Sequence, residues 1–139
     1  MMSLRKTILS NFLEDIWNRG LEDKLSEYLA PEYVIHHDPG DPWHGKTLDI
    51  DGFRQRLLVS RAPFPDQRFD IQDMLEDGDK IAISWLWQAT HVGELAGIPA
   101  TGRVIHMSGL TIYSFSGDRL SGHWQMVDRL GVFQQLSAS

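Results

Sequence analysis

The chain has 139 residues, 42% of them hydrophobic and 23% charged, so it is long and apolar enough to build one domain with a core and is not disordered. Thirteen Lys and Arg residues against 19 Asp and Glu residues give a net charge of −6, which argues against nucleic acid or an anionic membrane surface as the partner. The lack of cysteine excludes disulfides, thiolate zinc sites and cysteine nucleophiles.

The beginning of the chain contains no apolar signal segment, and no uncharged stretch is long enough to span a bilayer. We therefore expect a cytoplasmic protein with a single domain over residues 1–139.

Helical periodicity dominates the first 60 residues. Three helices are predicted, over residues 4–17, 21–29 and 50–61. Gly20 ends the first of them and Pro31 stops the second. The histidine-rich stretch at residues 33–46, between the second and third helices, is predicted to be irregular.

From Asp66 onward the hydrophobic period changes to two, which predicts strands. In the clearest strand Ile81, Ile83, Trp85 and Trp87 share one face. Strands are predicted around residues 69–74 and over 81–90, 103–115 and 119–127, with a turn at 77–79, a Gly/Pro-rich loop at 93–102 and a short amphipathic tail after 128.

This order of elements predicts an α+β fold in which three N-terminal helices pack on one face of a strongly curved antiparallel sheet. Such a sheet encloses a conical, apolar pocket suited to a small molecule. The other face is apolar at Leu120, Trp124 and Met126, and because helices can cover only one side we expect a homodimer or higher homo-oligomer through it.

The densest group of chemically active residues is His36, His37, Asp38 and His44. Imidazole and carboxylate groups are ordinary zinc and iron ligands, but the spacing matches no known site, so no metal is predicted. The alternative is a polar loop at the pocket rim in which His37 or Asp38 binds backbone groups.

On the last predicted strand, His123 and Gln125 share one face. If this face lines the pocket, His123 can act as an acid or base, whereas Gln125 can only donate and accept hydrogen bonds. A histidine satisfied inside the sheet is an equal alternative. Asp128 is a further catalytic candidate, although its place before the apolar tail favours helix capping.

Several segments together resemble the SnoaL-like polyketide (ester) cyclase family, and they cover nearly the whole chain in the family's order. They are residues 17–20, 29–34, 37–39 (His37-Asp38-Pro39), 64–66 (Phe64-Pro65-Asp66), 76–80, 90–102, 123–131 (beginning His123-Trp124) and 134–136. The resemblance implies the cone of the nuclear transport factor 2-like superfamily, with a deep pocket under a bent sheet.

Characterised cyclases of this family close a polyketide ring by an intramolecular aldol reaction without metal or cofactor, and an aspartate on the last strand acts as acid and base. In this chain Gln125 stands at that position, and Thr111 stands where aromatic polyketide cyclases place a histidine, while His123 is retained.

The leading hypothesis is a cofactor-independent cyclase acting on a small, mostly apolar or polyketide-like carbonyl compound. In it His123 transfers the proton, Gln125 orients the substrate or stabilises an oxyanion, and His37 or Asp38 assists from the rim. The predicted pocket residues are Phe12, Trp17, His91, Met107, Thr111 and Tyr113. The alternatives are a hydrolase, isomerase or dehydratase on the same fold, or a binding protein without catalysis.

Overall fold

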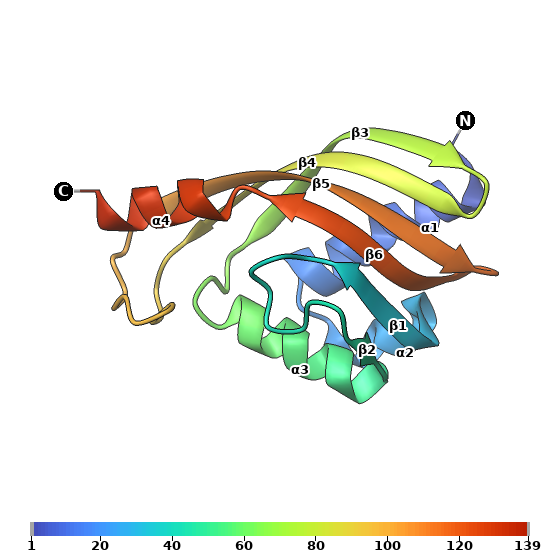
Figure 1. The fold of residues 1–139 in the computed structure, drawn as a ribbon, viewed down its shortest axis with the longest axis horizontal. Helices are drawn as coiled ribbons and strands as arrows, with labels where there is room; N and C mark the ends of the chain where they lie inside the picture. Colours follow the sequence, from blue (N-terminus) through green and yellow to red (C-terminus); the bar gives the residue numbers. More distant parts are fainter. Residues whose placement is uncertain (1, 139) are drawn as a thin grey trace.

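The computed structural model describes residues 2–138, and Figure 1 shows helices lying against one face of a curved sheet. The elements are α1 (Leu4–Phe12), the π-helix η1 (Leu13–Asn18), the 3-10 helix η2 (Glu22–Lys24), α2 (Leu25–Tyr28), β1 (Leu29–His37), β2 (Thr47–Leu48), α3 (Ile50–Arg61), β3 (Arg68–Asp77), β4 (Lys80–Thr90), β5 (Val104–Ser116), β6 (Arg119–Val127) and α4 (Arg129–Ser137). The predicted α+β class is confirmed. Within the described residues no helix has both the length and the apolar character needed to cross a membrane.

The helical patterns at the N-terminus and in α3 are confirmed. The Ser3 side chain caps α1 by accepting a hydrogen bond from the Lys6 backbone N–H at 3.1 Å. The helix continues as η1, and the Asn18 side chain at its end accepts from Phe69 N at 2.7 Å and donates to Phe69 O at 3.2 Å. This pair of bonds fixes the end of the first helix to the beginning of β3.

The six strands lie in the order β2-β1-β6-β5-β4-β3. Strands β3 to β6 form the predicted antiparallel meander, but β1 pairs with β6 in parallel, so the expectation of a wholly antiparallel sheet is wrong for this pair. The parallel pairing requires a long crossover, which α3 and the meander supply. It places Ile35 beside His123 and His37 beside Trp124.

The segment after α2 also differs from the prediction. The predicted helix over residues 21–29 is only η2 and α2, and β1 replaces the first part of the stretch expected to be irregular. Pro31 is tolerated in this strand because it falls in the register shift between Leu29 and Val34. Alternation within β1 then turns Tyr33 into the core, where it is 1% exposed.

Leu120 lies on the opposite side of the sheet from the one predicted. It is fully buried, whereas Met126 on the same strand is exposed and Trp124 is half-buried. The register between β5 and β6 shifts between Ser114 and Phe115, and a shift of this kind changes which residues face inward.

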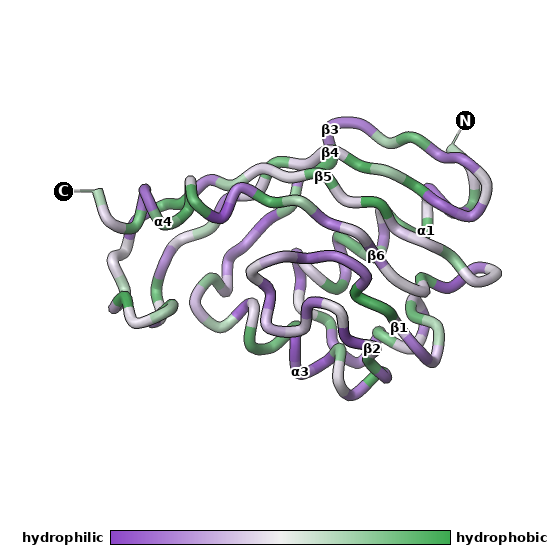
Figure 2. The backbone as a smooth tube through the Cα atoms, viewed as in Figure 1, coloured by the Kyte–Doolittle hydropathy of each residue, from purple (hydrophilic) through white to green (hydrophobic). Residues whose placement is uncertain are grey.

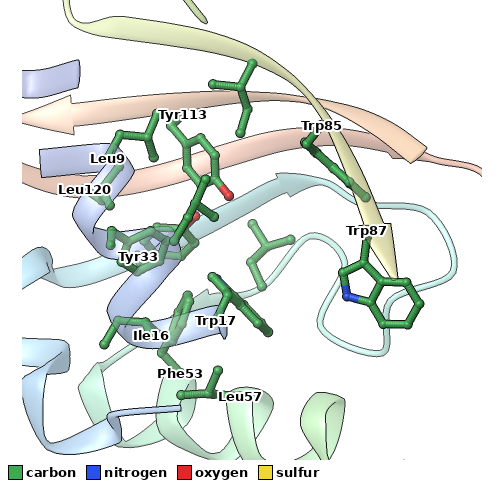
Figure 3. Close-up of a cluster of buried hydrophobic side chains, with 14 of the residues drawn as sticks. Leu9, Ile16, Trp17, Tyr33, Phe53, Leu57, Trp85, Trp87, Tyr113 and Leu120 are labelled. Atoms are coloured by element: carbon green, nitrogen blue, oxygen red, sulfur yellow. The ribbon is translucent and has the colours of Figure 1, made fainter. Parts of the chain in front are cut away.

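The core is built from aromatic rings contributed by both layers. Figure 3 shows Trp17 and Phe53 from the helices facing Tyr33, Tyr113 and Trp85 from the strands. The rings of Tyr33 and Phe53 meet edge to face with their centroids 5.0 Å apart, and those of Trp17 and Phe53 do so at 6.0 Å.

The outward face of the sheet carries exposed apolar side chains. Leu86, Leu110, Ile112 and Met126 are each at least 41% exposed. Figure 2 shows hydrophobic and hydrophilic residues alternating along the strands, and in Figure 1 no described helix lies over this side. We call these four residues the outer apolar face.

We expect Gly109→Ala to destabilise the protein by about 1–3 kcal/mol, because a Cβ at this position of β5 would lie 2.3 Å from Cζ2 of the buried Trp85 ring. Urea unfolding measures the loss. Ser108→Ala is the matched control, since Ser108 precedes Gly109 in β5 and its side chain is exposed, and it should change stability by less than about 0.5 kcal/mol. Equal stability of the two variants would contradict the packing described for Trp85.

Candidate functional site

A cavity of about 440 Å³ lies between the helices and the inner face of the sheet. This volume is in the range of small-molecule sites. Aromatic residues dominate its wall, among them Trp17, Phe53, Phe64, Phe69, Trp85 and Trp87. Its polar lining includes Tyr33, Asp41, Arg56, His123, Gln125 and Arg129. The cavity therefore offers an apolar enclosure with a cluster of hydrogen-bonding and charged groups.

Behind this polar cluster lies Asp38, which is 0% exposed. One carboxylate oxygen, Oδ2, lies 2.9 Å from His123 Nε2 and accepts from Gln125 Nε2 at 3.1 Å and Arg56 Nη2 at 3.3 Å. The other, Oδ1, accepts from Arg129 Nη2 at 2.8 Å. Burial by itself would raise the pKa of Asp38, but the hydrogen bond with His123 and the charges of Arg56 and Arg129 lower it below its ordinary value. Asp38 is therefore a buried, ionised carboxylate.

The two arginines are themselves held by further acceptors. Arg56 Nη2 also donates to Asp41 Oδ2 at 3.1 Å, and Arg129 Nε donates to Pro39 O at 2.9 Å. Gly40 leaves the space that Arg129 needs, because a Cβ there would lie 2.5 Å from Arg129 Cδ, and its φ of +94° also favours glycine. Two carboxylates and two guanidinium groups thus neutralise one another at this end of the cavity.

His123 is 3% exposed and has both ring nitrogens in contact with protein groups. Nε2 faces Asp38, and Nδ1 lies 2.7 Å from the Tyr33 hydroxyl. Burial lowers the pKa of His123 below its ordinary value, and Arg56 adds to that effect, while the hydrogen bond with Asp38 opposes it. The ring is therefore neutral at neutral pH and can accept a proton.

Gln125 belongs to a chain of side-chain hydrogen bonds that crosses the sheet. Trp85 Nε1 donates to Thr111 Oγ1 at 2.9 Å, Thr111 Oγ1 donates to Gln125 Oε1 at 2.7 Å, and Gln125 Nε2 donates to Asp38. Both ends of the amide are thus engaged. Its contacts hold Asp38, and the substrate-orienting role expected from the sequence stays a prediction.

Of the remaining catalytic candidates, His37 and Asp128 lie outside this cluster. His37 is exposed and packs edge to face against the His44 ring at 5.5 Å, without lining the cavity. Asp38 is fully buried and does not lie at the rim as expected. Asp128 caps α4, its Oδ1 accepting from Gly131 N at 2.8 Å, which is the alternative that the sequence favoured.

Of the six predicted pocket residues, Trp17, Met107 and Tyr113 line the cavity. The other three lie elsewhere. Phe12 is buried in the core against Phe53, and Thr111 is turned to Trp85 and Gln125. His91 is buried at the end of β4, with Nδ1 bonded to Thr101 and its ring beside Phe64.

The site residues that the sequence did not indicate include Tyr33, Arg56 and Arg129. An arginine on the same helix face as Phe53 and Leu57 signals a buried ion pair. Tyr33 becomes recognisable only once residues 29–37 are assigned to a strand. Across residues 2–138 no group of three or more His, Asp or Glu side chains is arranged to hold a metal ion.

The family model and three similar proteins all indicate polyketide cyclases. The model of the SnoaL-like polyketide cyclase family matches residues 7–136. A crystal structure of a candidate polyketide cyclase from Acidithiobacillus ferrooxidans is 50% identical, with a TM-score of 0.94 and coverage of 98% of this chain and 96% of that one.

Two further proteins extend the comparison. IdmH, a candidate polyketide cyclase from Streptomyces antibioticus, is 29% identical, with a TM-score of 0.82 and coverage of 96% of this chain and 99% of that one. The nogalonic acid methyl ester cyclase of Streptomyces nogalater is 26% identical over 121 residues, which are 86% of this chain and 88% of that enzyme.

The buried His123 predicts that the protein loses stability on mild acidification. Because the pKa of His123 is lower in the folded protein than in the unfolded chain, the unfolded chain binds more protons as the pH falls below about 6.5, which favours unfolding. Asp38, whose folded pKa is also lowered, adds its own loss only at more acidic pH. Urea unfolding at pH 7.5 and 5.5 measures the effect.

The change in stability between the two pH values should shrink in His123→Gln, which keeps a donor for Asp38 and removes the titration. His106→Gln is the control, because this histidine of β5 is exposed, and it should keep the wild-type change. A His123→Gln protein with the full wild-type change would show that His123 is not the group responsible.

Proposed function

The chain belongs to the SnoaL-like polyketide cyclase family, and we propose that it catalyses an intramolecular aldol ring closure of a neutral, polyketide-derived carbonyl compound. The proposal rests on one observation, the neutral His123 held against the ionised Asp38 at the wall of an aromatic cavity. A buried neutral imidazole can accept a proton, and the adjacent carboxylate stabilises the imidazolium that results.

In the proposed reaction a carbon next to a carbonyl group gives up a proton toward His123, and the resulting enolate is delocalised within the substrate. The carbanion then attacks a second carbonyl carbon to form the ring bond, and the proton returns to the new alkoxide. Atoms are conserved, so product and substrate have the same mass. The aromatic walls of the cavity supply the contacts expected for a polycyclic, mostly apolar molecule.

We expect the wild-type protein to convert nogalonic acid methyl ester, the substrate for which one relative is named, or a related polyketide methyl ester, into a product of equal mass and different retention time. Liquid chromatography with mass spectrometry measures the conversion. His123→Ala should lower the rate by about 10²–10⁴-fold, because a positioned acid–base group contributes that much. His106→Ala should retain the wild-type rate.

The same assay distinguishes the alternatives on this fold. A gain or loss of water would indicate a hydrolase or dehydratase instead of an aldol cyclase. A role in binding without catalysis is favoured by Gln125, an amide at the position of the family's usual aspartate. Saturable binding of the ester, with its recovery unchanged, would support that role and contradict the proposed cyclase.

We also propose that the protein is a homodimer formed through the outer apolar face. Leu110 is 62% exposed and Met126 is 60% exposed on neighbouring strands, and contiguous apolar surface of this kind is unusual on a monomer. Because two copies present the same face, a twofold axis can bury it.

Leu110→Lys should convert the dimer into a monomer, because it places a charge at the centre of the proposed interface. Light scattering after size exclusion measures the mass against the 15.9 kDa of one chain. Leu130→Lys is the matched control, since Leu130 is 68% exposed on α4, outside the outer apolar face, and it should remain dimeric. A monomeric wild-type protein at tens of micromolar would contradict the proposal.

A further inference from the structure

The contacts of His123 leave neither ring nitrogen directed to the open cavity. Nε2 lies 2.9 Å from Asp38 Oδ2, and Nδ1 lies 2.7 Å from the Tyr33 hydroxyl oxygen. A substrate in the cavity can therefore exchange a proton with a ring nitrogen of His123 only after the contact of that nitrogen with Asp38 or Tyr33 breaks, or through the side chain that makes the contact.

The charges around the ring determine where its proton lies. Asp38 is ionised between Arg56 and Arg129 and can only accept, so Nε2 carries the hydrogen. Because the ring is neutral, Nδ1 has a free electron pair and accepts the hydrogen of the Tyr33 hydroxyl. The order of donation is thus Tyr33 to His123 to Asp38.

Tyr33 lies beside His123 at the wall of the cavity. Its side chain lines the cavity, while its ring is fixed against Phe53 and lies 5.6 Å from the His123 ring. Figure 3 shows the hydroxyl groups of Tyr33 and Tyr113 facing the same interior region. With its hydrogen directed to Nδ1, the Tyr33 oxygen retains electron pairs that can accept from a bound molecule.

We propose that Tyr33 is the catalytic residue that contacts the substrate and that it passes protons between the substrate and Nδ1 of His123. This inference rests on the proposed function and deepens it. In the first half of the reaction the Tyr33 oxygen takes the proton from the substrate carbon while its own hydroxyl proton moves to Nδ1. The products of that step are the enolate, a neutral Tyr33 and an imidazolium beside the Asp38 carboxylate.

In the second half the movement is reversed. After the ring bond forms, Tyr33 donates its hydroxyl proton to the alkoxide and recovers a proton from Nδ1, so that the protein returns to its starting state with no net gain or loss of protons. Burial raises the pKa of Tyr33 well above its ordinary value, which makes a free phenolate unfavourable. A coupled transfer avoids that phenolate because the oxygen gains one proton as it loses the other.

The decisive variant is Tyr33→Phe, which keeps the ring and removes the hydroxyl. With the substrate that the wild type converts, kcat should fall by about 10²-fold or more, the range of acid–base contributions, while KM changes only a few-fold. Tyr28→Phe is the control, because that tyrosine bonds Asp15 outside the cavity and should leave the rate unchanged. A Tyr33→Phe protein with nearly wild-type kcat would overturn the proposal, since Nδ1 would then accept the proton directly.

A second measurement is independent of turnover. Nitrogen-15 NMR of the imidazole at pH 7.5 should show Nε2 protonated and Nδ1 unprotonated, and Tyr33→Phe should move the Nδ1 resonance. Loss of this donor should also raise the pKa of His123, with Asp38, Asp41 and Arg56 remaining as its charged neighbours.

The kinetic and NMR measurements together distinguish failure of the proposed cyclase activity from failure of the proposed role of Tyr33. A wild type that converts no ester but shows the expected NMR pattern contradicts the proposed function and still supports the order of donation from Tyr33 to His123 to Asp38. A protonated Nδ1 in the wild type, or an Nδ1 resonance that does not move in Tyr33→Phe, overturns the assignment of Tyr33 whatever the activity.

Discussion

The burial of one ionised carboxylate is the constraint on which the site depends. An unpaired carboxylate in the protein interior costs several kcal/mol, so Asp38 needs donors around it. They come from three other elements of the fold: Arg56 from α3, His123 and Gln125 from β6, and Arg129 from the beginning of α4, while Asp38 itself follows β1. The elements that enclose the cavity are thereby tied together at the point where its polar groups meet. The hydrogen bonds and ion pairs of Asp38 consequently both connect the elements of the fold and set the charge of the site.

The contact with the Asp38 carboxylate explains why an amide fits at position 125. A carboxylate in its place would stand about 3 Å from Asp38, and two like charges at such a distance cannot both ionise at neutral pH. The amide donates to Asp38 instead and is held by Thr111, which is in turn held by Trp85. The negative charge beside the cavity is thus that of Asp38, which directly follows β1 and contacts His123, and not that of a group on the last strand.

The sequence predicted local structure well where one periodicity was uninterrupted. The helix at residues 50–61 and the strand at residues 119–127 have the predicted bounds because their patterns have no competing signal. Strand β1 was missed because Pro31 resembles a breaker and its partner β6 lies some 90 residues away. The same separation along the chain explains why the sequence did not show which site residues lie together. Asp38 and His123 were each candidates, but only the parallel pairing of β1 with β6 brings them together, and the inward direction of Tyr33 follows from that strand.

The charge balance at the polar end of the cavity also limits what can bind there. Arg56 and Arg129 are already paired with Asp38 and Asp41, so among the described residues at this end of the cavity a substrate carboxylate would find no uncompensated cation. A desolvated charge without a partner binds poorly in an apolar enclosure. An esterified acid has no such penalty, and its carbonyl oxygen can accept hydrogen bonds from neutral donors such as Tyr113. Under the proposed function, the ion pairs that keep Asp38 buried therefore also favour a neutral ester over the corresponding free acid.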